Sequence, residues 1–177
     1  MKFIKIIKKK KNDIEIYCLV FEYDPSFIFL EDYYNKYKKN FSDEKDFKPL
    51  DENIILNFFK QLIEGLKYLQ KKSIILRNIK LDSILLDENN KIKIFDFSLS
   101  ALIPDDNPEN KDKETFLFTK YEKAGRIDFI PNELRYGQIY DYRVDIFSLG
   151  LTILCLMSFE SPIILINKNH KNMLLEQ

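Results

Sequence analysis

The sequence has no tryptophan, one histidine, two cysteines and only four glycines among its 177 residues. The glycines are Gly65, Gly125, Gly137 and Gly150, and their spacing excludes a Gly-x-Gly-x-x-Gly loop of the kind that covers phosphate groups. The histidine, His170, lies in a polar stretch and is most simply a surface residue. Any phosphate site in this chain must therefore be built without a glycine-rich loop.

The sequence also has no excess of charge of either sign. Lys plus Arg and Asp plus Glu each number 28, so the formal net charge is zero. This balance argues against bulk electrostatic binding to nucleic acid or to an anionic membrane. The most apolar segment, residues 146–159, is too short to span a bilayer and directly follows Asp145. We therefore expect neither a nucleic-acid nor a membrane partner.

The cysteines and the N-terminal sequence both indicate the cellular compartment. Cys18 and Cys155 both lie inside apolar runs, which favours small buried side chains over a disulfide or a metal site. The N-terminal MKFIKIIKKKK interrupts its apolar residues with lysine, unlike the core of a secretory signal. Free thiols are typical of a reducing compartment, so the sequence predicts a cytoplasmic protein.

The apolar pattern of the first part of the chain predicts a strand pair followed by helices. Residues 15–23 are rich in β-branched and aromatic side chains and follow a polar turn, so they should pair with FIKII, residues 3–7. A short helix is expected over 27–37. A core helix is expected over 54–69, with Asp51 as its N-cap, because apolar residues recur there with helical spacing.

The second part of the chain predicts a hairpin, a loop and a buried helix. Residues 83–86 and 91–95 read as short strands joined by the turn DENN. The segment 102–113 is charged and contains two prolines, so it reads as a loop. Residues 146–157 read as an apolar helix. No internal repeat is present, and the length favours one domain over residues 1–177.

The order of these elements and the motifs between them resemble a eukaryotic protein kinase. LVFEY resembles the last small-lobe strand and the hinge, and QLIEGLKYLQ resembles the helix before the catalytic loop. LRNIKLDS stands where the family has His-Arg-Asp-x-Lys-x-x-Asn, and DFS stands where it has Asp-Phe-Gly. GRIDFIPNE resembles the segment that closes with Ala-Pro-Glu, and VDIFSLG resembles the start of the Asp-x-Trp-Ser-x-Gly helix.

The resemblance implies an α+β, kinase-like fold. Most of it would be the helical large lobe, with a remnant small-lobe β-hairpin. Residues 1–23 would form the end of the small lobe and the hinge, and residues 24–177 an incomplete large lobe. Order and spacing carry the resemblance, since Asn78 and Asp96 lie 18 positions apart (96 − 78) and are joined by a hairpin.

The resemblance also implies residues for ATP and Mg²⁺. Phe21 would be the gatekeeper beside the adenine, and the backbone of Glu22 to Asp24 would meet the adenine edge. Leu85 would form the floor of that pocket. The carboxylate of Asp96 would hold Mg²⁺, whereas Ser83 offers only a hydroxyl where the family has a second metal-binding residue, Asn.

The catalytic loop retains some of the family's chemistry and lacks the rest. Asn78 replaces the aspartate that acts as the base, and an amide is uncharged and cannot accept the proton. Lys80 is retained where the family contacts the transferring phosphate, which places the resemblance with the Ser/Thr kinases. Arg77 is retained as well. It could pair with a phosphate on Thr115, Thr119 or Tyr121 of the expected activation segment, although an unmodified loop is the simpler interpretation.

Other positions are expected to be structural. Leu76 replaces the loop histidine and is expected to keep an apolar stack with Phe97. Ser98 replaces a glycine, and its Cβ would restrict the motion of this motif. The resemblance implies that Asp145 accepts backbone hydrogen bonds from the catalytic loop. Glu133 would have lost the arginine that it pairs with in the family.

Three functions stay open on these grounds. The first is a pseudokinase-like module with weak or no ATP binding that works by binding a protein partner. The second is a Ser/Thr kinase with residual activity, completed by sequence outside this chain. The third is the product of a gene fragment with no function. Because the helices over 54–69 and 146–157 are apolar on more than one face, we also expect self-association or a protein partner.

Overall fold

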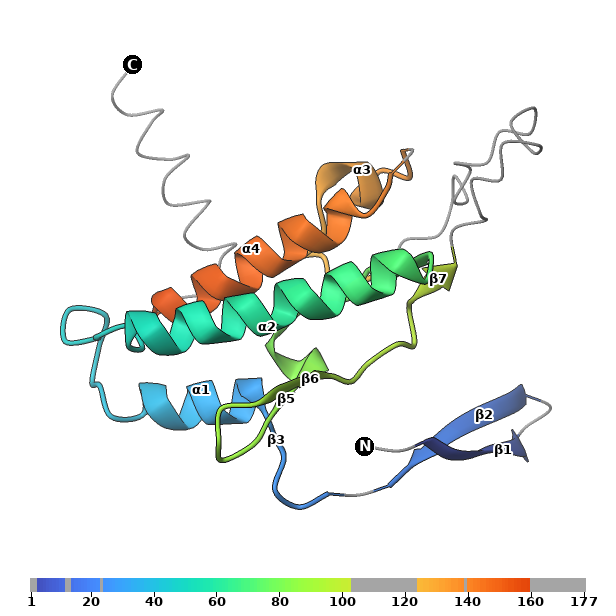
Figure 1. Cartoon of the computed structure of the whole chain (residues 1–177), viewed down its shortest axis with the longest axis horizontal. Helices are drawn as coiled ribbons and strands as arrows, with labels where there is room; N and C mark the ends of the chain where they lie inside the picture. The colour runs from blue at the N-terminus through green and yellow to red at the C-terminus, as the bar shows by residue number, and fades with distance from the viewer. Residues whose placement is uncertain (1–2, 12–13, 23, 103–123, 139, 160–177) are drawn as a thin grey trace.

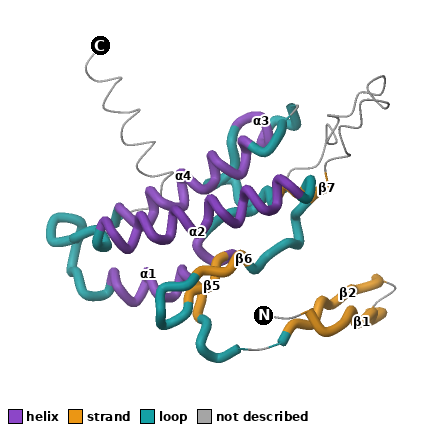
Figure 2. Tube along the Cα trace, viewed as in Figure 1, coloured by secondary structure: helices purple, strands orange, loops and turns teal. Residues whose placement is uncertain are grey.

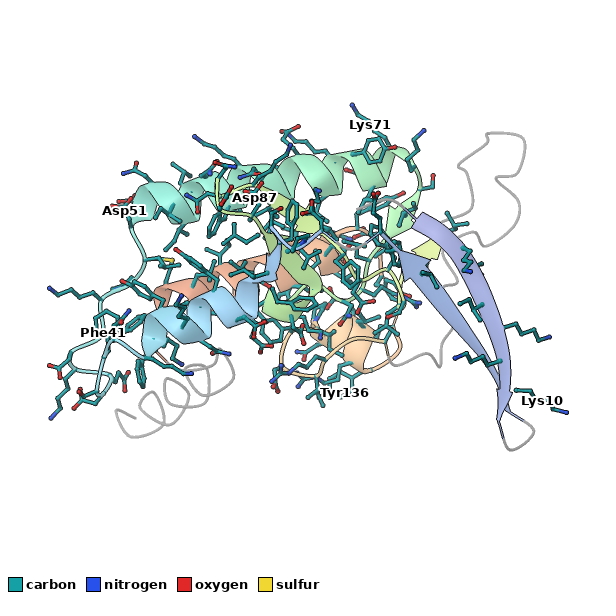
Figure 3. All side chains as sticks on the ribbon, turned by 90° about the horizontal axis from the view of Figure 1, so that it is seen from below. Lys10, Phe41, Asp51, Lys71, Asp87 and Tyr136 are labelled. Carbon is teal, nitrogen blue, oxygen red and sulfur yellow. The ribbon has the colours of Figure 1, made fainter. Side chains whose placement is uncertain are left out.

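The computed structural model describes residues 3–11, 14–22, 24–102, 124–138 and 140–159. The described residues form seven strands in three small sheets, four α-helices and a 3₁₀ turn (Figure 1). The fold is α+β, as the sequence predicts. The helices α1, α2 and α4 run roughly along the long axis of the molecule in both views (Figures 1 and 3).

The first sheet is the predicted hairpin. Strand β1 (Phe3–Lys11) pairs antiparallel with β2 (Ile14–Phe21) from Phe3 opposite Phe21 to Lys11 opposite Ile14. Figure 1 shows this hairpin projecting from the helical body. The Phe21 ring meets the Phe95 ring edge to face, with 5.6 Å between centroids. This contact brings the end of the hairpin to the segment that carries Asp96.

The helix expected over 27–37 begins later than predicted. Residues 28 and 29 form a short strand, β3 (Ile28–Phe29), and α1 spans Leu30–Lys38. Strand β3 pairs antiparallel with β5 (Ile84–Leu86), more than fifty positions further along the chain. The apolar pattern around residue 28 suits a helix locally, but this long-range pairing satisfies the backbone of both residues instead.

The long core helix is confirmed. Helix α2 spans Glu52–Lys71, and the side chain of Asp51 caps it by accepting a hydrogen bond from the Asn53 N–H at 2.9 Å. The ends of the helix are marked by Asp51 and Lys71 in Figure 3. One stripe of the helix is buried in the main core: Ile55, Phe58, Leu62, Leu66 and Leu69.

The predicted central hairpin is also present. Strand β5 pairs antiparallel with β6 (Ile92–Ile94), and the Asn90 N–H donates to the Asp87 carbonyl across the turn. Ser83 lies outside the strand, because residues 81–83 form a 3₁₀ turn (Leu81–Ser83). The sequence analysis missed a further pair, β4 (Ile74–Ile75) with β7 (Ala101–Leu102), since two-residue strands carry no alternation that a pattern could show.

The last described elements are α3 (Asn132–Arg135) and α4 (Arg143–Met157), which confirms the predicted apolar helix. Helix α4 packs against α2, and its most buried residues include Val144, Leu149 and Leu156. None of the described helices combines the length and the apolar character needed to cross a bilayer.

Both long helices also expose apolar side chains. On α2 these are Leu56 (44% exposed), Phe59 (40%) and Tyr68 (62%). On α4 they are Ile146 (50%), Phe147 (44%) and Met157 (51%). The described fold therefore leaves apolar helix surface facing solvent.

Candidate functional site

The catalytic-loop positions lie in the loop between β4 and β5, and Asp96 follows β6. Figure 2 shows the connection from β6 to β7, which carries Asp96, as a loop beside α2. The fold brings Asn78 and Asp96 together across 18 positions of sequence: Asn78 Nδ2 donates a hydrogen bond to Asp96 Oδ2 at 2.7 Å. Asn78 is only 7% exposed. The amide at the base position is therefore a hydrogen-bond donor to the carboxylate expected to hold the metal.

Both oxygens of Asp96 are engaged by protein donors. Its Oδ1 accepts a hydrogen bond from the Ser98 N–H at 2.9 Å, and its Oδ2 accepts the bond from Asn78. Burial opposes ionisation of this carboxyl, but the hydrogen bonds from Ser98 and Asn78 and the charge of Lys80 outweigh it and lower its pKa. Asp96 is therefore a carboxylate held in place from two sides.

The ammonium group of Lys80 is paired within its own turn. Its Nζ donates to Asp82 Oδ2 at 2.6 Å and lies 2.5 Å from Asp82 Oδ1 as an ion pair. The Lys80 side chain is 17% exposed. The sequence analysis did not single out Asp82, although a carboxylate two residues from this lysine was the available signal. In this arrangement the charge that the family directs at phosphate is neutralised by Asp82.

Ser83 uses its hydroxyl to close the 3₁₀ turn. Its Oγ accepts a hydrogen bond from the Lys80 N–H at 3.0 Å and donates one to the Lys80 carbonyl at 2.9 Å. The residue is 2% exposed. Its expected role as a metal ligand stays a prediction, and the hydroxyl proton is already committed to the backbone.

The buried carboxylate of Asp145 anchors the catalytic loop to α4. Asp145 Oδ2 accepts a hydrogen bond from the Leu76 N–H and Oδ1 accepts one from the Arg77 N–H, both at 2.8 Å. Asp145 is 3% exposed, and burial raises its pKa to about 6 although both hydrogen bonds and the Arg77 charge act in the opposite direction. These are the backbone contacts that the sequence analysis expected of Asp145.

Arg77 joins three parts of the fold. Its Nε donates to the Leu99 carbonyl at 2.7 Å, and its Nη1 donates to the hydroxyl of Tyr140 at 3.0 Å. Both Arg77 and Tyr140 are buried. The sequence analysis missed Tyr140, which stands in a polar stretch without a motif of its own. Thr115, Thr119 and Tyr121, the residues considered as phosphate carriers, lie outside the described residues, as does His170.

The residues expected around adenine belong to different elements of the fold. Glu22 is exposed just after β2, and the Asp24 carboxylate closes a turn by accepting hydrogen bonds from the Ser26 N–H (3.1 Å) and Oγ (2.6 Å). These bonds lower the pKa of Asp24. Leu85 is 4% exposed and pairs in β5 between Phe29 and Lys93. Their role toward nucleotide stays a prediction.

The three remaining positions that were expected to be structural, Phe97, Leu76 and Glu133, differ in their surroundings. Phe97 is 39% exposed and lines a cavity of about 210 Å³ against α2 and β6, whereas Leu76 is 1% exposed within the main core. Glu133 lies half-buried in the first turn of α3. Its carbonyl accepts a hydrogen bond from the Gln138 N–H at 2.7 Å.

A small cavity of about 130 Å³ opens beside the Lys80–Asp82 pair, between α1, the catalytic loop and α4. Arg126 and Asp128, which form an ion pair at 3.5 Å, were also missed by the sequence analysis. The charged residues that line the cavity are Glu31, Lys38, Lys80, Asp82, Arg126 and Asp128. Acidic and basic groups balance, so the cavity has no net preference for ligands of one charge.

The chain matches the family model described as "Protein kinase domain" over residues 2–177. It is 30% identical over 138 residues to a "Probable serine/threonine-protein kinase KIN1 homolog" from Encephalitozoon cuniculi, which covers 77% of this chain and 22% of that protein. It is 32% identical over 114 residues to an "Aurora kinase" from Saccharomyces cerevisiae, covering 64% of this chain and 28% of the relative.

A third relative aligns over more of the chain. The "Serine/threonine-protein kinase PKH2" from Saccharomyces cerevisiae is 28% identical over 160 residues, 90% of this chain and 14% of that protein. The chain thus spans less than a third of the length of each of these relatives. The family match covers nearly all of the chain, and the kinase motifs lie in the order that the family has. This chain belongs to the protein kinase family.

Proposed function

We propose that this chain is a protein kinase domain in which phosphoryl transfer is impaired and which acts by binding a protein partner. The observation that carries the proposal is the Asn78–Asp96 hydrogen bond, 2.7 Å long. A general base must accept the proton of the attacking hydroxyl, and the amide of Asn78 cannot do so. The ion pair between Lys80 and Asp82 supports the same conclusion, because it neutralises the charge available for the transferring phosphate.

A Ser/Thr kinase with residual activity is the second candidate. It is favoured by the retained carboxylate of Asp96 and by the anchoring of the catalytic loop on Asp145. Sequence outside this chain would have to supply the missing glycine-rich loop and the Val-Ala-Ile-Lys strand whose lysine contacts the ATP phosphates in the family. The product of a gene fragment without a function is the third candidate. A cytoplasmic location fits all three, since Cys155 is a buried free thiol.

Phosphoryl transfer by the full chain tests the proposal. We expect transfer from Mg·ATP to a generic protein substrate at background level, since losing a positioned base alone reduces the rate about 10²–10⁴-fold. The measurement is incorporation of labelled phosphate, with the Asp96→Asn variant prepared in parallel to identify a contaminating kinase. A rate on the order of 1 s⁻¹ that disappears in Asp96→Asn would contradict the proposal and favour the second candidate.

Weak nucleotide binding is a separate expectation. The adenine positions are Phe21, the backbone of Glu22 to Asp24 and the side chain of Leu85, and the sequence has no glycine-rich loop to cover the phosphates. We expect millimolar Mg·ATP to stabilise the chain by less than about 1 kcal/mol, whereas a ligand at 1,000 times its Kd would contribute about 4 kcal/mol. Thermal unfolding measured with Mg·ATP, and with MgCl₂ alone as the control, decides between these values.

Association is expected to follow from the exposed apolar residues of α2 and α4. Light scattering coupled to size-exclusion chromatography at low micromolar concentration should show species larger than the monomer. The double variant Ile146→Lys/Phe147→Lys should increase the monomer fraction, because both side chains lie half-exposed on α4. Tyr136→Lys, at a position that is 69% exposed and belongs to neither helix, is the matched control and should leave the monomer fraction unchanged. A monodisperse wild-type monomer would remove the physical motive for partner binding.

A further inference from the structure

The cation that protein kinases use raises a question of fit at Asp96. Mg²⁺ prefers anionic and carbonyl oxygens in an octahedral arrangement, and it gives up its water ligands reluctantly. In phosphoryl-transfer sites Mg²⁺ is usually held by one or two carboxylates together with substrate phosphates and water. Asp96 is the one carboxylate at the expected position, and its two oxygens already accept hydrogen bonds from Asn78 and Ser98. The residues present do not fit the cation.

We propose that the Asn78 amide takes the place of a divalent cation at Asp96, so that this carboxylate is held by protein hydrogen bonds and does not bind Mg²⁺. The inference rests on the proposed function, because it explains how the impaired site is stabilised. It goes further because it gives the replacement of the family's aspartate by Asn78 a second effect, the loss of metal binding, in addition to the loss of the general base.

The orientation of the amide follows from the charge of its partner. The Nδ2 atom lies 2.7 Å from Asp96 Oδ2. Turning the amide over would place Asn78 Oδ1 against the carboxylate oxygen at the same distance, and two acceptors so close repel one another. The donor is therefore the atom that faces Asp96, and a cation that took the Oδ2 lone pair used by this hydrogen bond would displace the amide.

The neighbouring groups do not compensate for that loss. The Ser83 hydroxyl is buried and is bonded to the Lys80 backbone through its proton and one of its two lone pairs. The Lys80 ammonium is a hydrogen-bond donor paired with Asp82, so it offers a cation no oxygen ligand. A carboxylate at position 78 would favour cation binding, since it would remove the N–H donor and place a second anionic oxygen beside Asp96.

Binding of Mn²⁺ to the full chain tests this inference without any measurement of activity. Mn²⁺ takes the same oxygen ligands as Mg²⁺, and free Mn²⁺ is counted directly by electron paramagnetic resonance. We expect the wild type to bind no more Mn²⁺ than Asp96→Asn. We expect Asn78→Asp to bind it at least about tenfold more tightly than the wild type, because a second negative charge lies within a few ångströms of the cation.

Two further variants keep the test decisive. Asn57→Asp adds the same charge at an exposed position of α2 and should leave Mn²⁺ binding at the wild-type level. Asn78→Ala removes the donor without adding charge, so it should bind Mn²⁺ more tightly than the wild type, and it replaces Asn78→Asp if circular dichroism shows that variant unfolded. Wild-type binding that exceeds Asp96→Asn, or equal binding by the wild type and the position-78 variants, overturns the inference.

The Mn²⁺-binding test and the phosphoryl-transfer test can fail independently of one another. Mn²⁺ binding by the wild type at Asp96 with no phosphoryl transfer would overturn the replacement of the cation and leave the impaired kinase standing. Transfer by the wild type that is lost in Asp96→Asn would overturn the proposed function, whatever the resonance spectra show.

Discussion

Replacing Asp145 by alanine is expected to lower the free energy of unfolding by about 2–5 kcal/mol. The carboxylate is 3% exposed and accepts hydrogen bonds from the Leu76 and Arg77 N–H groups, both at 2.8 Å. Alanine would leave both buried donors without an acceptor. The catalytic loop would then lose two of its hydrogen bonds to α4.

Urea unfolding followed by circular dichroism, at one protein concentration, measures the effect. Glu88→Ala is the matched control, because Glu88 is an exposed carboxylate in the turn between β5 and β6, and surface changes of this kind stay within about 0.5 kcal/mol. An Asp145→Ala variant as stable as Glu88→Ala would show that the two backbone bonds contribute nothing net.

Asp145 should also make the free energy of unfolding depend on pH. Burial raises the pKa of Asp145 from 3.8 to about 6, so between these values the folded chain binds more protons at this site than the unfolded chain. The contribution of Asp145 is therefore largest at low pH and declines as the pH rises from about 4 to about 6. The lowered pKa values of Asp96 and Asp141 give the free energy of unfolding a pH dependence of the opposite sign. Subtracting the free energy of unfolding of Asp145→Asn from that of the wild type at each pH therefore isolates the contribution of Asp145.

Replacing Gly125 by alanine is the second large effect, with an expected loss of about 2–4 kcal/mol. Gly125 has φ +94°, a conformation that side chains with a Cβ rarely adopt. A Cβ there would lie 2.4 Å from the Arg77 carbonyl oxygen and 2.6 Å from Ile130 Cγ2. Because the first of these atoms is backbone of the catalytic loop, the clash cannot be relieved by a rotamer change.

Gly150 offers a matched control within the same chain. It lies in α4, and a Cβ added there would meet no atom within 4 Å. Gly150→Ala should therefore stabilise the chain by about 0.5–1 kcal/mol through helix propensity. Urea unfolding of both variants should move in opposite directions from the wild type. A Gly125→Ala variant at wild-type stability would mean that the segment around residue 125 relaxes away from Arg77 without loss.

Much of the fold could be predicted because its signals are local. The cap at Asp51 and the apolar stripe of α2 are encoded within one helix, and the turn at Asp87 joins two strands only a few residues apart. Strand β3 was missed because its partner, β5, lies far along the chain. The β4–β7 pair was missed for a related reason, since each strand is two residues long and is defined only by the other.

The sequence by itself determined the family and the chemistry available at each position: an amide at residue 78, a lysine at residue 80 and a carboxylate at residue 96. Only the tertiary structure decided where these groups point. Asn78 donates to Asp96 across 18 positions, and the Lys80 charge is paired with Asp82. The direction of a side chain depends on the donors and acceptors that packing brings within about 3 Å of it, and those come from distant parts of the chain. Residue types define what a site could do, whereas packing selects which of those interactions are formed.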